Sequence, residues 1–280
     1  MLRLPGRAPK PATSARLPDS GPVAELPGCD RLLVWACMVA ITALAWGYLF
    51  YLDHQMASAI QYDTMMAEMG MSEPRAWTRA DVFFTFAMWI VMMAAMMTAS
   101  AAPVLLLYAG LHARLDSHRV PLIVLLFGLG YLAVWVAFSA CATIAQWAMH
   151  EAAMLSPAMA MSSREAGGMI LFVAGAYQLT PLKRACLMHC RSPLGFLMTH
   201  WRDGKRGALE MGVRHGAFCL GCCWALMCVL FVSGVMTLLW VAILALLVML
   251  EKLGPGGTCV ARVGGVAMIV LGAWYLAGVR

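Results

Sequence analysis

The sequence predicts an all-α protein, a polytopic bundle of transmembrane helices, from three observations. Hydrophobic residues make up 62% of the 280 residues and charged residues only 12%, whereas a soluble domain carries roughly 25% charged residues. The mean hydropathy is +0.77. Several apolar runs reach the ~20 residues that a helix needs to cross the hydrocarbon core of a membrane. The lipid bilayer is therefore the first partner that the sequence predicts.

We expect seven spans and justify them by the apolar runs in chain order. They lie at about 32–52, 82–110, 120–147, 166–182, 212–232, 235–251 and 259–278. The fourth run is short and the sixth ends on Glu251 and Lys252, so six spans are the alternative count. Small residues allow helices to approach closely in lipid. The candidates for such contacts are Gly128, Gly130, Gly167, Gly168, Gly175, Gly264 and Gly265.

The charged residues predict the domain organisation and the orientation. Residues 1–30 are basic, rich in proline and without a periodic apolar face, so we expect a disordered cytoplasmic tail before a transmembrane domain at 31–280. Basic residues are also frequent in 183–211, which places this segment in the cytoplasm by the positive-inside rule. Its mixture of charges with Phe196 and Trp201 is typical of a segment that lies at the membrane surface. The excess of basic residues on the cytoplasmic side, which orients the protein in the membrane, thus accounts for the net charge of +6. We therefore expect no nucleic-acid partner.

Half of the ten cysteines lie in the short stretch between residues 186 and 223. They are Cys186, Cys190, Cys219, Cys222 and Cys223. Residues three or four apart share one face of a helix, and the last three cysteines span about 100° of the helix circumference. Both groups lie near the cytoplasmic side, so three or four thiolates could meet in one centre. Thiolates select Cu(I), Zn(II) or iron–sulfur clusters, and the CxxxC spacing with Met188 and His189 inside it favours Cu(I), because four-cysteine zinc sites use shorter spacings.

Packing is the alternative interpretation of any cysteine in a membrane helix, because a free cysteine behaves as a small hydrophobic residue. We accept this interpretation for the five cysteines outside the group, Cys29, Cys37, Cys141, Cys228 and Cys259. It explains the group itself less well, because packing does not predict pairs at helical spacing on two neighbouring segments.

Methionine supplies the second set of soft ligands. The chain has 24 methionines, and the run MWIVMMAAMM occupies residues 88–97. The candidate ligands there are Met92, Met93, Met96 and Met97. A thioether binds Cu(I) without losing a proton, but methionine also fills gaps between packed helices, and both interpretations stay open. Further methionines fall in the loops 53–81 and 148–165, which we interpret as solvated segments.

Polar side chains in or beside the spans are costly in hydrocarbon and are functional candidates for that reason. They are Gln146, Gln178, Glu210, Arg214, His215 and Glu251. Arg214 and Glu251 both lie near the cytoplasmic end of the fifth and sixth spans, which the Ser233-Gly234 turn joins, so we expect them to pair. The sequence has no P-loop, dinucleotide glycine fingerprint or nucleophile elbow. We therefore predict no catalytic residues and no ATP-driven pump.

Four pieces of the sequence together carry a resemblance to a known family. They are MWIVMMAAMM (88–97), YQLTPLKRACLMHCRSP (177–193), HGAFCLGCCWALM (215–227), and GVMTLLW (234–240) followed by Glu251-Lys252. The region 80–252 resembles the bacterial family of predicted metal-binding integral membrane proteins, a domain family of unknown function often labelled copper chaperone. The resemblance implies an inner-membrane protein that binds metal through the five grouped cysteines. Two positions depart from the family pattern: Thr98-Ala99-Ser100 precedes Pro103 where a proline commonly follows the methionines, and Thr237 stands where asparagine is common.

We therefore expect a bacterial inner-membrane protein with a cytoplasmic N-terminus that handles Cu(I), or alternatively Zn(II). It would sequester the metal or exchange it with a copper-donor or copper-acceptor protein. Two other functions stay open. A thiol–disulfide oxidoreductase would cycle Cys186/Cys190 or Cys219/Cys222 between dithiol and disulfide, although no CxxC occurs in a thioredoxin-like context. A non-catalytic assembly or scaffold protein would use the cysteines only for packing.

Overall fold

The structure, a computed structural model, describes residues 28–70, 77–113, 120–156, 159–235 and 237–278. The all-α prediction is confirmed, because these residues form nine helices and no strand. The helices are α1 (Gly28–Glu68), α2 (Arg79–Ala113), α3 (Val120–Glu151), α4 (Arg164–Gln178), α5 (Pro181–Arg191), α6 (Pro193–His200), α7 (Gly204–Ser233), α8 (Leu238–Leu253) and α9 (Gly257–Leu276). The disordered tail predicted at 1–30 lies almost entirely outside the described residues.

Five of these helices are long and apolar enough to cross a membrane. They are α1 over Arg31–Ala57, and α2, α3, α7 and α9 over their full lengths. The two other predicted spans correspond to α4 and α8, which have 15 and 16 residues and fall short of the ~20 residues of a full crossing. The transmembrane helix bundle is thus confirmed, and seven is an approximate count of its spans.

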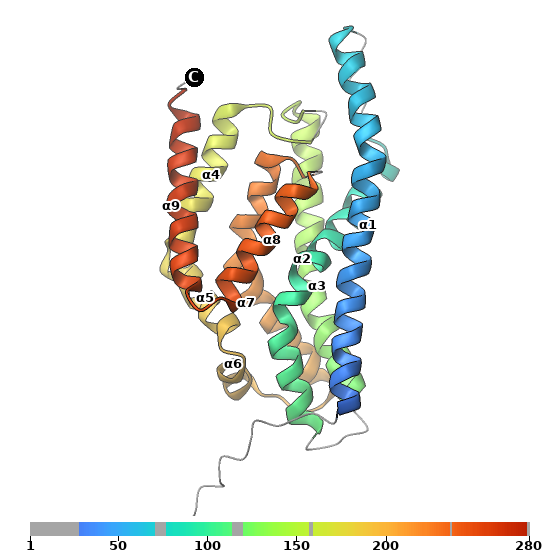
Figure 1. The fold of residues 1–280 in the computed structure, drawn as a ribbon, viewed down its shortest axis with the longest axis vertical. Coiled ribbons are helices and arrows are strands. Elements are labelled where there is room, and N and C mark those ends of the chain that lie inside the picture. Colours follow the sequence, from blue (N-terminus) through green and yellow to red (C-terminus); the bar gives the residue numbers. More distant parts are fainter. Residues whose placement is uncertain (1–27, 71–76, 114–119, 157–158, 236, 279–280) are drawn as a thin grey trace, which may run out of the picture.

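The predicted surface segment 183–211 is mostly helical. It contains most of α5, all of α6 and the first turns of α7, at the end of the bundle where α1 begins (Figure 1). Pro181 and Pro193 each occupy the first turn of a helix, where a missing N–H group costs nothing. Proline interrupts the hydrogen bonds of a preceding helix, and Pro181 and Pro193 mark the starts of two short helices, of which α5 packs against α7.

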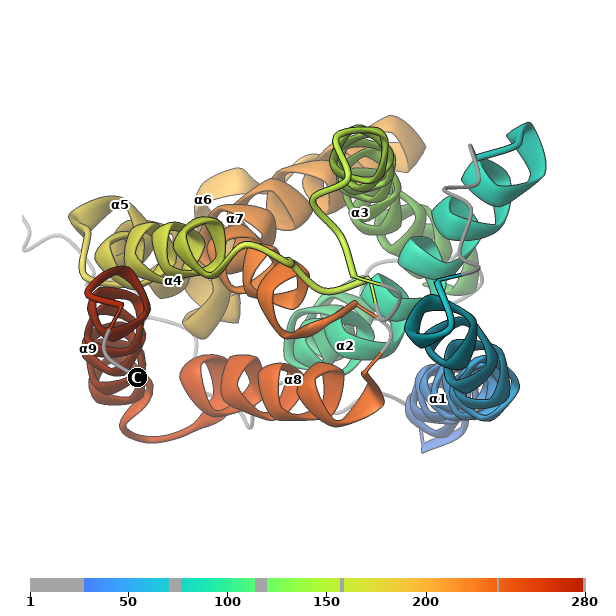
Figure 2. The same cartoon turned by 90° about the horizontal axis from the view of Figure 1, so that it is seen from above.

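Glycines bring two pairs of helices close together. An added Cβ at Gly175 in α4 would lie 2.6 Å from the carbonyl oxygen of Gly265 in α9, and Gly212 in α7 lies directly against the backbone of α3 at Phe127. Figure 2 shows α4 beside α9 along one side of the bundle. The predicted close contacts are confirmed at Gly130, Gly167, Gly168, Gly175 and Gly265. The prediction is wrong for Gly128, where no atom of the described chain lies within 4 Å of an added Cβ.

The methionine-rich helix α2 lies between α1, α3 and α8 (Figure 2). Its four candidate methionines, Met92, Met93, Met96 and Met97, are at most 1% exposed. Trp89 in the same helix donates a hydrogen bond from Nε1 to Gln146 Oε1 in α3 over 2.7 Å. Gln146 therefore has a structural role, joining two helices inside the bundle.

Candidate metal centre

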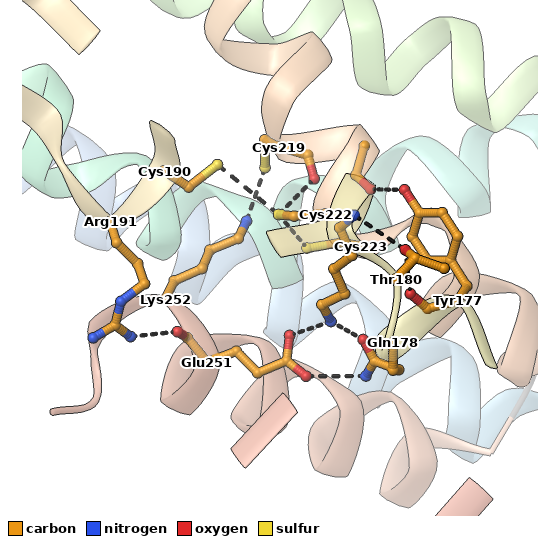
Figure 3. A network of polar contacts seen from close by, with 12 residues as sticks. Tyr177, Gln178, Thr180, Cys190, Arg191, Cys219, Cys222, Cys223, Glu251 and Lys252 are labelled. Atoms are coloured by element: carbon orange, nitrogen blue, oxygen red, sulfur yellow. Dashed lines mark hydrogen bonds and ion pairs between the residues drawn. The ribbon is translucent and has the colours of Figure 1, made fainter. Parts of the chain in front are cut away.

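Four of the five grouped cysteines converge where α5 crosses α7. The Sγ atoms of Cys190 and Cys222 are 3.9 Å apart, and those of Cys222 and Cys223 are 3.2 Å apart. The Cys222 thiol also donates to the carbonyl oxygen of Cys219 over 3.1 Å. All four side chains are buried, and Figure 3 shows their sulfurs gathered in one place. We call Cys190, Cys219, Cys222 and Cys223 the thiol cluster.

The distances within the thiol cluster suit pairs of thiolates that share an ion. Two sulfurs bound to one ion at about 2.3 Å lie no more than about 4.6 Å apart, and the contacts of Cys222 with Cys190 and Cys223 are both shorter than this. In the described part of the chain, however, no three His, Cys, Asp or Glu side chains are arranged around a common point that could hold a metal. The sequence-predicted ligands are thus assembled in pairs, and metal binding by them stays a prediction.

Cys186 lies apart from the thiol cluster, although it is one helical turn from Cys190. It packs against α7 at Gly221, where an added Cβ would lie 2.8 Å from Cys186 Sγ. The backbone of Gly221 is also fixed by Tyr177, whose hydroxyl donates to its carbonyl oxygen over 2.5 Å. Burial raises the pKa of the Cys186 thiol, which disfavours the thiolate that binds metal.

Lys252, at the end of α8, reaches the thiol cluster and is a candidate functional residue that the sequence interpretation missed. Its ammonium group donates to Cys219 Sγ over 2.9 Å and to Ser100 Oγ over 3.1 Å, and it lies 4.0 Å from Met97 Sδ. The side chain is only 4% exposed. Because a buried charge needs a partner, the position of Lys252 suits an ion pair with a Cys219 thiolate.

Tyr131 connects the same cysteine to the methionine-rich helix. Its hydroxyl lies 3.1 Å from Cys219 Sγ and donates to the backbone carbonyl of Met97 over 3.1 Å. Because the Met97 thioether also lies 4.0 Å from Lys252 Nζ, Met97 is a candidate methionine beside the thiol cluster. Met92, further along α2, lines a small cavity together with Met56 and Met88. Nine residues separate Met88 from Met97, about 14 Å along a helix, so the methionines extend from the thiol cluster into the bundle.

A second buried network holds α5 and α8 together beside the thiol cluster (Figure 3). Lys183 forms an ion pair with Glu251 over 2.6 Å, with both side chains 1% exposed. Gln178 donates to Glu251 over 3.0 Å and accepts from Lys183. Arg191 donates to the backbone carbonyl of Glu251 over 2.6 Å. These contacts fix α5, which carries Cys190, against α8, which carries Lys252.

The predicted ion pair between Arg214 and Glu251 is wrong. Arg214 instead pairs with Glu210, one turn earlier in α7, over 3.1 Å, and both side chains are about 40% exposed. Arg202 also pairs with Glu210, over 2.6 Å. Arg214 points outward from α7, and Lys183 of α5 is the cation that meets Glu251 inside.

The arrangement defines a class of protein: a helical membrane bundle whose interior holds thiols, thioethers and a buried ammonium group near one end. A family model described as copper chaperone, PpoB2, matches residues 86–275 of the chain. The chain belongs to this family, which confirms the predicted resemblance and extends it beyond residue 252 through most of α9. Searches of curated proteins and of solved structures each found no match.

Proposed function

We propose that this protein is a copper chaperone of the bacterial inner membrane, which binds Cu(I) through the thiol cluster and passes it to another protein. The observation that carries the proposal is the meeting of Cys190 from α5 with Cys219, Cys222 and Cys223 from α7 in a buried place. Membership in a family described as copper chaperone supports the same metal. The lysines and arginines of α5 and of the first turn of α7 support a cytoplasmic position for this end of the bundle and for the N-terminus.

The chemistry of the side chains favours Cu(I) over harder cations. Soft sulfur ligands suit Cu(I), whereas carboxylate and carbonyl ligands suit magnesium and calcium. Glu251, which lies beside the thiol cluster in Figure 3, is engaged by Lys183 and Gln178. Zn(II) is the alternative that the sulfurs also suit. Met97 and the other α2 methionines would provide weaker sites along which Cu(I) moves toward a partner.

Lys252 has a distinct part in this proposal. A metal-free thiolate in a buried site needs a positive partner, and the ammonium group 2.9 Å from Cys219 Sγ supplies one. Cu(I) carries the same single charge, so it would replace the ammonium group as the partner of the thiolate. If Lys252 releases one proton to water as copper binds and takes it back as copper leaves, the buried charge stays unchanged.

Metal content of the purified protein tests the proposal. The triple variant Cys219→Ser, Cys222→Ser, Cys223→Ser should lose most of the copper that the wild-type protein carries after expression in copper-supplemented cells. The matched control replaces Cys37, Cys141 and Cys259, which are exposed on the outer faces of their helices, and should keep it. If both triple variants contain the same amount of copper and the same amount of zinc as each other, metal binding by the thiol cluster is contradicted.

A thiol–disulfide function is the second candidate, because Cys190 and Cys222 come from different helices and their sulfurs are 3.9 Å apart. Oxidation would join these two sulfurs and release two protons and two electrons to an acceptor. Alkylation of free thiols in cells that have been quenched and denatured with acid, followed by peptide mass spectrometry, distinguishes the two functions. A copper chaperone keeps Cys190 and Cys222 alkylatable, whereas an oxidoreductase holds a fraction of them as a disulfide.

A further inference from the structure

Three histidines lie between the surface of the protein and the thiol cluster. His189 in α5 and His200 in α6 are partly exposed, and their ring centroids are 6.1 Å apart. His215 in α7 is buried, with 2% of its surface exposed. The outer pair thus lies at the end of the bundle that carries α5 and α6, and the inner histidine lies one helical turn before Cys219.

Hydrogen bonds orient both outer imidazoles in the same way. His189 Nδ1 lies 2.9 Å from the carbonyl oxygen of Ala185, and a carbonyl oxygen only accepts, so this nitrogen carries the proton. His200 Nδ1 lies 2.8 Å from Thr199 Oγ1 and 3.3 Å from the carbonyl oxygen of Phe196, which likewise makes it the donor. The Nε2 atom of each ring keeps its lone pair. Metal-binding histidines are commonly held by such a bond from the other ring nitrogen.

The spacing of His189 and His200 suits one ion bound between them. Two imidazoles that bind an ion at about 2.0 Å from opposite sides place their ring centres roughly 6 Å apart. The observed separation is 6.1 Å. Linear coordination by two nitrogens is a normal geometry for Cu(I), and an ion with only two ligands leaves room for a third ligand to displace one of them.

Two phenylalanines connect this outer pair to the inner histidine. The ring of Phe196 lies 5.1 Å from His200 and 5.0 Å from His215. Phe218 stacks on His189 at 4.2 Å and immediately precedes Cys219 in α7. Phe196 thus contacts both His200 and His215, whereas Phe218 contacts His189 and is the chain neighbour of Cys219.

His215 has a buried nitrogen that the packing leaves unused. Its Nδ1 atom has no hydrogen-bond partner among the described residues, although its ring lies beside Tyr131 and Phe127. An unsatisfied buried polar atom is costly. Residues four apart share a helix face, so His215 and Cys219 lie on the same side of α7, and a ligand-binding role for His215 explains the unpaired nitrogen.

We propose that His189 and His200 form an acceptance site for Cu(I), from which His215 passes the ion to Cys219. The proposal rests on the proposed function of the thiol cluster. Copper stays Cu(I) along the route, so no electron is transferred. Phe196 contacts both His200 and His215, so its ring moves aside as His215 reaches the copper ion. Each step then forms one bond from copper to an imidazole nitrogen or to the Cys219 thiolate and breaks one bond to the previous nitrogen. The protein thus has a route into its buried cluster as well as the cluster itself.

The rate of copper uptake tests this route separately from copper capacity. The full-length, metal-free protein in detergent is mixed with Cu(I) held by a coloured small-molecule chelator, and the loss of the chelator complex is followed in time. The double variant His189→Ala, His200→Ala should take up copper at least about tenfold more slowly and reach the same final copper content. His54→Ala, which removes an exposed histidine of α1, is the matched control and should load at the wild-type rate.

His215→Phe tests the inner step, because phenylalanine preserves the aromatic packing while it removes the nitrogen. We expect slower loading with unchanged helical content and elution volume. Wild-type rates in both the double variant and His215→Phe would overturn the route and leave the thiol cluster as the copper site. A wild-type protein that takes up no Cu(I) from the chelator would overturn the route and the proposed function together.

Discussion

The region around the thiol cluster and the contact between α4 and α9 are built in different ways. Along α4 and α9, glycines such as Gly175 and Gly265 bring two backbones together, and the contact depends on shape. At the thiol cluster, α5, α7 and α8 meet through charged and sulfur-containing side chains such as Lys183, Glu251 and Lys252. Shape alone is enough to hold helices together in lipid, so the costly buried charges at the thiol cluster indicate a function.

The cysteines show the same contrast within one residue type. Cys37, Cys141 and Cys259 are exposed on the outer faces of the helices, where lipid surrounds the bundle. The members of the thiol cluster are buried and contact one another or Lys252. The first set does not pack inside the bundle, and its members act as small hydrophobic residues on exposed faces. The second set requires helices to be held in a fixed position, and the buried ion pair provides this.

Removal of the buried carboxylate should have the largest effect on stability. Glu251→Ala leaves Lys183 buried without its partner, which should cost about 3–5 kcal/mol of unfolding free energy. Glu210→Ala removes a carboxylate that pairs with two exposed arginines and should cost about 0–1 kcal/mol. Denaturant unfolding in detergent, followed by circular dichroism, compares the two. Equal losses would mean that the Lys183–Glu251 pair contributes no more than a surface pair.

Filling the space between α4 and α9 should have the next largest effect. Gly175→Leu forces a side chain against the backbone of α9 and should cost about 1–3 kcal/mol. Gly128→Leu, on the outer face of α3, is the matched control because it meets open space. Thermal unfolding in detergent measures the loss of stability in both variants. Copper content per folded molecule should be unchanged in each, and a loss of copper in Gly175→Leu would show that the two regions are coupled.

Replacement of the buried ammonium group should act on copper rather than on stability. Lys252→Met keeps the length of the side chain and removes the charge beside Cys219, so we expect Cu(I) affinity to fall about 10- to 100-fold, as for other groups that contact metal ligands. Lys205→Met, at an exposed position in α7, is the control. Competition with a Cu(I) chelator of known affinity gives the Cu(I) affinity of both variants. Wild-type affinity in Lys252→Met would remove Lys252 from the site.

The apolar runs predicted the helices well, because a stretch of hydrophobic residues in lipid has few alternatives to a helix. Helical spacing also predicted that Cys190 would meet the cysteines of α7. Helical spacing could not predict the partner of Glu251, because the partner depends on how α7 is rotated about its axis. In the structure Arg214 faces the surface, and Glu251 forms its ion pair with Lys183 of α5.

Lys252 was missed for a related reason. A lysine after an apolar run is normally the end of a span, with its charge at the membrane surface. Here α8 ends inside the bundle, and the side chain points inward to Cys219. A signal was present in the sequence, since Glu251 and Lys252 are adjacent charges in one of the pieces that carry the family resemblance, but only the fold shows that they serve two separate buried networks.

The smallest expected effect concerns Cys186, and it separates the two cysteines of the CxxxC piece. Spacing alone treats Cys186 and Cys190 as equivalent ligands, whereas the structure directs Cys186 against Gly221 and Cys190 toward Cys222. Cys190→Ser should therefore lower Cu(I) affinity at least about tenfold, and Cys186→Ser should change it less than about twofold, which is under 0.5 kcal/mol. Chelator competition on the two purified variants measures the difference. If the two variants lose Cu(I) affinity equally, Cys186 must leave Gly221 and join the thiol cluster when copper binds. All five cysteines would then be copper ligands.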